Sequence, residues 1–457
     1  MNGPNSGKDV FIPLNLLIGG KDMLGKGWMM LMNCLSVGRS ISLPAVGTGA
    51  AKYTSLVTGQ YTRIREQFNV PLAAFEGIQE SLARIGGNAW LMDSARLLTA
   101  QAVDLGEKPS VLSAILKYHL TERGRECIRH AMDVHGGKGI IMGPNNYLGR
   151  NWQGAPIFIT VEGANILSRN LMIFGQGAIR CHPFVLKEMA LAGREDHEQA
   201  LDEFDDLLMK HIMFAAGNAA STLVLGLGLG LIEKAPGDAL SQGYFRALNR
   251  QAAAFALLAD LSMMLLGGAL KRRERLSARL GDVLSHLYLS SAALKRYHDL
   301  GSPEHMQPLL RWAMEESLAS QRAPWTGCST TSQIALSAAP CVCWCSRSAD
   351  ATPGQATSWM PKLQSCWVVA KVTQPWSSYW LAASGLRQKV TRWPHCNAPA
   401  MRWTMLPRCT GRCLRQSRTA PSSRRQGNAR LGQLSKLAFF NLVRASGSRQ
   451  PSKHVGR

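Results

Sequence analysis

The stretch "PLAAFEGIQESLARIGGNAWLMDSARLLTAQAVDLGEKPS", residues 71–110, decides the fold that this sequence predicts. Apolar side chains recur in it every three or four residues, which places them on one face of a helix. The residues on that face are Ile78, Leu82, Ile85, Ala89 and Met92. Residues 106–109, Gly-Glu-Lys-Pro, end this helix, and a second helix is predicted from Ser110 to about His135. Two long helices joined by a short turn predict an antiparallel pair in a helical bundle.

The neighbouring segments extend this bundle. In the second helix the predicted inward residues are Leu112, Leu116, Leu120, Ile128 and Met132. Gly136 and Gly137 then stop the helix. Upstream, residues 23–67 are mostly helical in pattern, with an interruption expected at Pro44. The stretch "DVFIPLNLLIGG", residues 9–20, is typical of a short strand and its exit turn.

The charge divides the chain into two unequal parts. The formal net charge of the 457 residues is +22. Residues 321–457 hold 20 lysines and arginines and a single acid, Asp350, whereas residues 1–320 hold 32 basic and 29 acidic residues. Eight of the 11 cysteines and eight of the 12 tryptophans also follow Ser320. The basic charge is therefore a property of the tail, and the rest of the chain is close to neutral.

Three interpretations compete for the tail. Cys341, Cys343 and Cys345 offer metal ligands, but C-x-C-x-C lacks the paired two-residue spacings of a structural zinc site. A basic arm for nucleic acid would run from Arg402 to Arg430, where acids are absent. Neither pattern comes with a sustained helical or strand periodicity.

The third interpretation of the tail is a frame-shifted translation. With permitted codons, reading from the third base of Ala323 yields a sequence that has acids, a helical apolar rhythm and no Cys or Trp. That sequence would continue the amphipathic helix "LLRWAMEESLASQ" at 309–321. Enrichment in Arg, Cys, Ser and Trp with a loss of acids matches no folded class. We therefore expect residues 321–457 to be frame-shifted or disordered, and we expect no metal site and no nucleic-acid partner.

A candidate catalytic base lies in "FITVEGANIL", residues 158–167, where Glu162 follows an uncharged, mostly apolar run and precedes a glycine. Burial of a carboxylate raises its pKa towards the range in which a base is useful. The alternative is a first-turn Glu that favours a helix N-terminus. The next segment predicts a helix with Ile166, Leu167, Asn170, Leu171 and Phe174 on one side.

Three motifs carry a family resemblance. They are "REQFNVPLAAFEGIQESLARI" at 65–85, "MDVHGGKGI" at 132–140 and "ITVEGANIL" at 159–167. In this order and spacing they resemble the C-terminal helical domain of the acyl-CoA dehydrogenase family, and most of all its large bacterial fatty-acid β-oxidation branch, which carries an extra C-terminal helical region. The resemblance covers about residues 8–320.

The resemblance implies a mainly α fold and an FAD-dependent enzyme. The fold would be the helical bundle of the acyl-CoA dehydrogenase C-terminal domain, preceded by the end of a β-domain and followed by a further helical region and a disordered tail. The predicted parts are 1–22 for the end of the middle β-domain, 23–184 for the bundle, 185–320 for the additional helical domain and 321–457 for the tail. The chain would then be a fragment, inactive on its own.

The implied reaction converts a fatty acyl-CoA to the trans-2-enoyl-CoA. In the family, the Glu of the E-G motif removes the α-proton of the thioester while the β-hydrogen leaves as hydride to the flavin, and Glu162 occupies that place. Such a base must be desolvated and aimed from the face opposite the flavin. On the substrate side, Arg39 corresponds to the family's Arg, and Gly163 follows the base. The alternative function is an inactive helical module that only associates with itself or with partners.

The resemblance also implies residues that contact FAD. Arg65, Gln67 and Phe68 match the R-x-Q-F segment, whose Arg contacts the dinucleotide phosphates across a subunit boundary, and an Arg fork suits a phosphate. The other implied flavin residues are Asp133, Gly136, Gly137, Ala164 and Asn165. Asp133 stands where the family usually has Gln, and an acid is unfavourable beside a phosphate. For His135, beside the glycine stop, a packing or capping role is predicted.

The implied partners are a fatty acyl-CoA, electron-transfer flavoprotein as electron acceptor and a second copy of the chain in a homo-oligomer. Residues 252–270 are apolar enough to raise the question of a membrane span, but Asp260 at their centre favours a buried bundle helix. A peripheral membrane contact stays open. With Cys34, Cys127 and Cys181 scattered and no apolar leader at the start, a cytoplasmic location is predicted, with association to the inner face of the membrane as an option.

Overall fold

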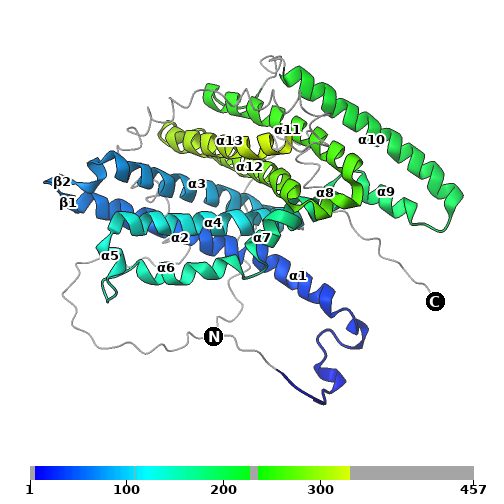
Figure 1. The fold of residues 1–457 in the computed structure, drawn as a ribbon, viewed down its shortest axis with the longest axis horizontal. Coiled ribbons are helices and arrows are strands. Elements are labelled where there is room, and N and C mark those ends of the chain that lie inside the picture. The colour runs from blue at the N-terminus through cyan, green and yellow to red at the C-terminus, as the bar shows by residue number, and fades with distance from the viewer. Residues whose placement is uncertain (1–5, 108, 227–234, 330–457) are drawn as a thin grey trace, which may run out of the picture.

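The computed structural model of the chain describes residues 6–107, 109–226 and 235–329, and these residues form an almost entirely helical structure. The predicted mainly α fold is thereby confirmed. Figure 1 shows two layers of long helices that lie against each other, with a further pair of helices extending to one side. The N-terminal layer contains the predicted bundle and the candidate base.

The first part of the chain, up to Cys181, consists of eight α-helices with short turns, one two-stranded hairpin and one π-helical segment. Its elements are η1 (Leu14–Leu16), η2 (Lys21–Met23), α1 (Gly27–Ser40), α2 (Ser42–Ile64), β1 (Glu66–Gln67), β2 (Val70–Pro71), η3 (Leu72–Ala74), α3 (Glu76–Asp104), α4 (Ser110–His135), α5 (Gly137–Ile140), α6 (Gly149–Gly154), η4 (Ala155–Ile159), α7 (Asn165–Leu167), η5 (Ser168–Gln176, π-helical) and α8 (Gly177–Cys181). The strands β1 and β2 pair antiparallel.

The second part is helical throughout its described residues. Its elements are α9 (Val185–Ala192), α10 (His197–Gly226), α11 (Ala239–Leu266), η7 (Gly267–Arg272), α12 (Glu274–Asp299), η8 (Glu304–Met306) and α13 (Gln307–Ser329). The last helix, α13, runs beyond the predicted boundary at Ser320. The remaining predictions for the tail lie outside the described residues.

The predicted antiparallel pair is α3 and α4, which lie side by side with α2 in Figure 1. The interruption expected at Pro44 occurs at Ile41, between α1 and α2. Pro44 occupies the first turn of α2, where a missing N–H costs nothing because that group would have no helical partner. The α4 helix ends at His135, where Gly136 takes a φ of +51°, as the glycine stop predicts.

Two glycines allow α2 and α4 to approach closely. A Cβ at Gly47 of α2 would overlap the backbone carbonyl of Leu120 in α4, and a Cβ at Gly124 of α4 would come within 3.0 Å of the carbonyl oxygen of Gly47. The α4 backbone is therefore fixed against α2. This matters for function because α4 also carries side chains that hold the candidate base.

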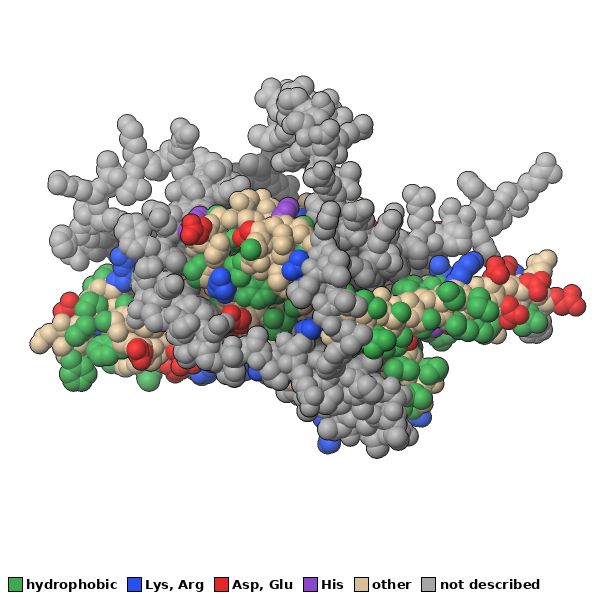
Figure 2. All heavy atoms as spheres, turned by 90° about the horizontal axis from the view of Figure 1, so that it is seen from above, with side chains coloured by type: hydrophobic (Ala, Val, Ile, Leu, Met, Phe, Trp, Pro, Cys, Tyr) green, Lys and Arg blue, Asp and Glu red, His purple; other side chains and the backbone are tan. Residues whose placement is uncertain are grey.

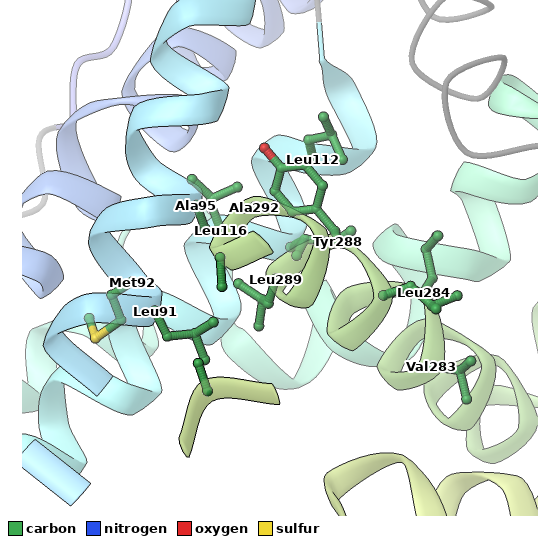
Figure 3. Close-up of a cluster of buried hydrophobic side chains, with 14 of the residues drawn as sticks. Leu91, Met92, Ala95, Leu112, Leu116, Val283, Leu284, Tyr288, Leu289 and Ala292 are labelled. Atoms are coloured by element: carbon green, nitrogen blue, oxygen red, sulfur yellow. The ribbon is translucent and has the colours of Figure 1, made fainter. Parts of the chain in front are cut away.

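The main core joins the two parts of the chain. Figure 3 shows Leu91, Met92 and Ala95 of α3 facing side chains of α12. The same cluster includes Leu112 and Leu116 of α4, and its α12 members are Val283, Leu284, Tyr288, Leu289 and Ala292. Because one continuous apolar cluster spans these helices, burial of this core stabilises both parts together.

A buried ion cluster reinforces the same contact. Asp93 of α3 is fully buried and pairs with Lys52 of α2 at 2.6 Å, with Arg96 at 2.9 Å and with Arg296 of α12. Arg296 also lies over the ring of Trp90, 4.5 Å from its centroid. A buried carboxylate requires such partners, since leaving it unpaired would be costly.

The helices α9 and α10 form the side extension, and α11 packs against both α10 and the main core. In Figure 2 hydrophobic side chains run along this arm and acidic side chains gather at its tip. The large apolar side chains of α10 that are exposed are Leu201, Leu208, Met209, Ile212, Met213, Leu223 and Val224. In the described part of the chain, Ala239–Arg272 is long and apolar enough to cross a membrane, and 39% of its most apolar 18-residue window is buried. By itself this is weak support for a span, because core helices of soluble proteins pass the same test.

One sequence-based prediction about the fold is wrong. Residues 9–20 form no strand; they contain the 3₁₀ turn η1, and Phe11 is 87% exposed. A strand is stable only when its N–H and C=O groups pair with a neighbouring strand, and none of the described residues offers one here. The apolar composition of the segment was therefore no guide to its local structure.

Candidate active site

The candidate base lies in a tight loop between η4 and α7. Glu162 has a φ of +59° and Gly163 a φ of +111°, so two successive residues adopt left-handed backbone conformations. For a residue with a Cβ this conformation costs roughly 1–2 kcal/mol, and it persists only where the surroundings enforce it. The loop therefore presents Glu162 in a conformation that its own sequence does not favour.

The helix α1 holds one side of this loop in its conformation. The Nε of Arg39 donates a hydrogen bond to the carbonyl oxygen of Glu162 at 3.0 Å. The neighbouring Gly38 leaves the space that the Glu162 carboxylate fills, since a Cβ at position 38 would overlap one of its oxygens. Arg39 thus fixes the backbone of Glu162, and Gly38 determines where its side chain lies.

The helix α4 holds the other side of the loop through Lys117. This side chain is completely buried. Its ammonium donates to the carbonyl oxygens of Phe158 at 3.0 Å and Gly163 at 2.5 Å, and to the Oδ1 of Asn165 at 2.5 Å. All three donor hydrogens of the ammonium are used, and its acceptors lie before, within and after the loop that carries Glu162.

Asn165 extends this network back to α4. Its Nδ2 donates to Thr121 Oγ1 at 3.1 Å and to Glu122 Oε1 at 2.5 Å. The side chain was predicted to contact flavin, but its amide is already engaged within the chain. Asn165 therefore anchors the start of α7 to α4, and its contact with a cofactor stays a prediction.

The electrostatics around Glu162 favour a basic carboxylate. Burial raises the pKa of Glu162, while the nearby positive charges of Arg39 and Lys117 oppose the rise. The Oε2 of Glu162 is buried and has no hydrogen-bond partner in the described part of the chain. Burial, together with the nearby charge of Arg39, lowers the pKa of Lys117 to about 8. A desolvated carboxylate with an unengaged oxygen can accept a proton from a weak carbon acid.

The structure brings together Arg39, Glu162, Gly163 and Asn165, with Ala164 exposed at the start of α7. Of the apolar side chains predicted to face inward after the base, Phe174 is buried, but Ile166 is 77% and Leu167 47% exposed. The α7 turn therefore packs through Asn165, and the prediction was wrong for these two residues. The helix continues directly into the π-helical η5, whose wider turn changes which side chains share one face.

The other predicted flavin residues lie elsewhere. Arg65, Gln67 and Phe68 are exposed at the β1–β2 hairpin, at the opposite end of the N-terminal layer from α7 in Figure 1. Gly136 and Gly137 are exposed at the end of α4, which rises 1.5 Å per residue, so Gly136 lies roughly 29 Å along the helix from Lys117. Within the described residues of one chain, the predicted flavin residues at these ends therefore lie apart from the loop that carries Glu162.

Two residues near that glycine pair are accounted for by local contacts. Asp133 is exposed and pairs with Arg129 at 3.3 Å. His135 is buried, hydrogen-bonds Ala131 O and Tyr147 OH, each at 2.8 Å, and stacks on Tyr61. The packing role predicted for His135 is confirmed.

Lys117 is the site residue that the sequence analysis missed. A usable signal existed, because Ser113, Lys117 and Thr121 are spaced by four and face the same way on a helix whose other faces are largely apolar. A lysine in such a helix is usually read as solvent-facing. Here the covering segment comes from residues 158–165, more than 40 positions later.

A partly buried carboxylate on a firmly held backbone makes this loop a candidate site for proton abstraction. The comparisons with known proteins identify the class. Residues 25–173 match the family model "Acyl-CoA dehydrogenase, C-terminal domain", and residues 179–327 match "Acyl-CoA dehydrogenase, C-terminal, bacterial type". The chain belongs to the acyl-CoA dehydrogenase family.

Individual relatives match parts of the chain. A probable acyl-CoA dehydrogenase of Bacillus subtilis is 24% identical over 294 residues, 60% of this chain and 44% of that protein. The protein HemX of Proteus mirabilis is 56% identical over 59 residues, 13% of this chain and 35% of that protein, a stretch too short to carry an argument. The chain spans less than half the length of these curated relatives.

A solved structure supports the fold. An acyl-CoA dehydrogenase complexed with FAD from Bacillus anthracis has a TM-score of 0.55 at 18% sequence identity, over 77% of this chain and 57% of that one. At this identity the likeness establishes the helical architecture alone.

The contact between Gly38 and Glu162 predicts a sharp effect of one methyl group. In Gly38→Ala the carboxylate must move, and a displacement of about 1 Å lowers a positioned reaction roughly 10²-fold. Stability should change by less than about 1 kcal/mol, because the alanine favours the helix and the overlapping group is the end of a flexible side chain. Rates of flavin reduction by acyl-CoA and thermal unfolding together check this expectation.

The matched control is Gly49→Ala, at an exposed position of α2 where an added Cβ meets nothing within 4 Å. This variant should be slightly more stable, because alanine favours a helix, and its rate of flavin reduction should be unchanged. A Gly38→Ala protein that reduces flavin as fast as this control would show that the position of the Glu162 carboxylate is not set by α1.

Proposed function

We propose that the protein is an FAD-dependent acyl-CoA dehydrogenase of fatty-acid β-oxidation, in which Glu162 removes the α-proton of a fatty acyl-CoA. The observation that carries the proposal is the state of this carboxylate. It is partly desolvated, its backbone is held in a left-handed conformation by Arg39 and Lys117, and one of its oxygens has no hydrogen-bond partner among the described residues. Membership of the acyl-CoA dehydrogenase family supports the same reaction class.

The chain's own residues perform the proton transfer. Glu162 accepts the α-proton through its carboxylate, and the resulting neutral acid is favoured by the burial that raises its pKa. Arg39 and Lys117 keep the carboxylate ionised before the reaction, since both positive charges oppose that rise. FAD, when bound, accepts the β-hydrogen as hydride, so that the fatty acyl-CoA becomes the trans-2-enoyl-CoA.

The residues assigned to FAD fit an anionic dinucleotide at the far end of the bundle. Arg65 and Gln67 are exposed donors, and the backbone at Gly136 and Gly137 is open, because an added Cβ at either meets nothing within 4 Å. Since roughly 29 Å of α4 separates Gly136 from Lys117, a flavin beside Glu162 would meet the Arg65 end of a second copy. We therefore include a homo-oligomer in the proposal.

The remaining partners follow from the same reaction. Electrons from the reduced flavin would leave to electron-transfer flavoprotein. We place the protein in the cytoplasm, with a peripheral contact to the inner face of the membrane through the apolar arm as an additional feature. Because the chain spans less than half the length of these curated relatives, we propose that its 457 residues alone are inactive.

The test uses the protein purified from its own cells, so that any segment joined to this chain in the cell is present. We expect bound FAD, and we expect anaerobic addition of a medium- or long-chain acyl-CoA to bleach the flavin absorbance and give the trans-2-enoyl-CoA. A preparation free of flavin, or one whose flavin no fatty acyl-CoA bleaches, would overturn the proposal. Recombinant residues 1–457 alone should neither retain FAD nor bleach it.

A further inference from the structure

Four ionisable side chains meet at the base of the side extension, far from Glu162 in the sequence. His182 follows α8, Glu188 lies in α9, His211 in α10 and Asp260 in α11. His182 Nε2 is 2.7 Å from Asp260 Oδ1, and His211 Nε2 is 3.6 Å from the same oxygen. One ligand atom from each of His182, His211 and Asp260 lies within 4.8 Å of the others.

Some polar atoms of this cluster have no hydrogen-bond partner among the described residues. Asp260 is only 9% exposed, and its Oδ2 is buried with no hydrogen-bond partner in the described part of the chain. His211 Nδ1 is bound to Glu188 Oε1 at 2.7 Å, so a neutral His211 carries its proton on Nδ1 and turns the lone pair of Nε2 towards Asp260. The lone pair of His211 Nε2 and the Asp260 carboxylate thus face each other 3.6 Å apart, an unfavourable arrangement that a cation would relieve.

The surroundings match the outer environment of a metal site. A metal-binding His usually donates its other ring N–H to a carboxylate, which fixes the tautomer and raises the basicity of the ring, and Glu188 does this for His211. Phe184 stacks on His211 with ring centroids 5.1 Å apart, and Phe214 lies edge-on to His182. This apolar shell limits the access of water.

We propose that His182, His211 and Asp260 bind one divalent cation of the zinc class, with Glu188 orienting His211. Two imidazoles and one carboxylate suit Zn²⁺, whereas Ca²⁺ and Mg²⁺ prefer oxygen ligands alone. Since His211 is 20% exposed, water can complete the coordination. The ion would tie α10 to α11 and to the turn after α8, and no described residue of α10 belongs to the main core.

Binding has one local cost. His182 Nδ1 accepts from the backbone N–H groups of Phe184 and Val185, both at 3.3 Å. When Nε2 binds the ion, its proton moves to Nδ1, and these two long hydrogen bonds are lost. The turn before α9 must therefore adjust on binding, and the amides of Phe184 and Val185 report on it.

The experiment uses recombinant residues 1–457, stripped with a chelator and loaded with Zn²⁺ or Co²⁺. We expect Asp260→Asn and His211→Gln to hold one metal ion per chain fewer than the unaltered protein. Each variant should lose part of the visible absorption of bound Co²⁺. The lost part should contain no thiolate charge-transfer band, which distinguishes this site from the cysteines of the tail. His298→Gln, at an exposed position near the end of α12, should keep the ion.

A gentler variant keeps the test valid if the buried substitutions unfold the arm. Glu188→Gln leaves every ligand in place and should weaken binding about 10–100-fold. Equal metal content and equal affinity in the unaltered protein and all of these variants would overturn the proposal. So would a lost signal that shows thiolate charge transfer.

Discussion

The Glu162→Gln variant is expected to bind flavin and acyl-CoA normally and to reduce the flavin roughly 10²–10⁴-fold more slowly, the range for loss of a general base. Glutamine has nearly the shape of glutamate, so it fits beside Gly38. The hydrogen bond from Arg39 reaches the backbone carbonyl of residue 162, and the variant retains it. Only the proton-accepting oxygen is lost.

Stopped-flow flavin reduction in protein from its own cells measures this effect, with flavin content and acyl-CoA affinity measured in parallel. Glu80→Gln is the matched control, since Glu80 makes only an exposed pair with Arg84. Its rate should equal that of the unaltered protein, because exposed pairs of this kind contribute little. A Glu162→Gln protein that keeps more than about a tenth of the rate would assign proton abstraction to another group.

The local part of the structure could be predicted from the sequence. The α3 and α4 helices, the turn between them and the end of α4 at Gly136 follow from apolar periodicity and glycine, which act within a few residues. Glu162 could be proposed as the base because its motif is contiguous. The partial burial of its carboxylate agrees with that prediction.

The non-local part could not be predicted. Lys117 reads as a surface residue until residues 158–165 fold over it, and His182, His211 and Asp260 are 29 and 49 positions apart, a spacing that matches no metal motif. The expected strand at 9–20 failed for the related reason that pairing depends on a partner elsewhere. What a side chain does here is determined by which segment covers it.

The Lys117→Met variant should lose both activity and stability. Methionine fills a similar length but donates nothing, so the carbonyl oxygens of Phe158 and Gly163 and the Oδ1 of Asn165 lose their donor. Unsatisfied buried groups cost on the order of 1–3 kcal/mol each, and removal of the buried ammonium offsets part of this. We expect the free energy of unfolding, measured with denaturant, to fall by about 2 kcal/mol.

The same substitution should change the pH profile in a direction that the charges determine. Lys117 is one of two positive charges that hold down the burial-raised pKa of Glu162, so its removal raises that pKa further. Because only the ionised carboxylate accepts the α-proton, activity appears as pH rises through this pKa. The acid limb of the flavin-reduction rate should therefore move to higher pH in Lys117→Met.

Lys117→Arg separates the charge of Lys117 from its hydrogen bonds. The guanidinium keeps the positive charge, so the acid limb should stay near its original pH, but its planar fork cannot reproduce the three bonds of an ammonium and the plateau rate should fall. Lys138→Met, at an exposed position, should change neither. If Lys117→Met kept both the original acid limb and the original plateau, the loop would hold Glu162 without α4. The positioning role would then belong to Arg39 and α1 alone.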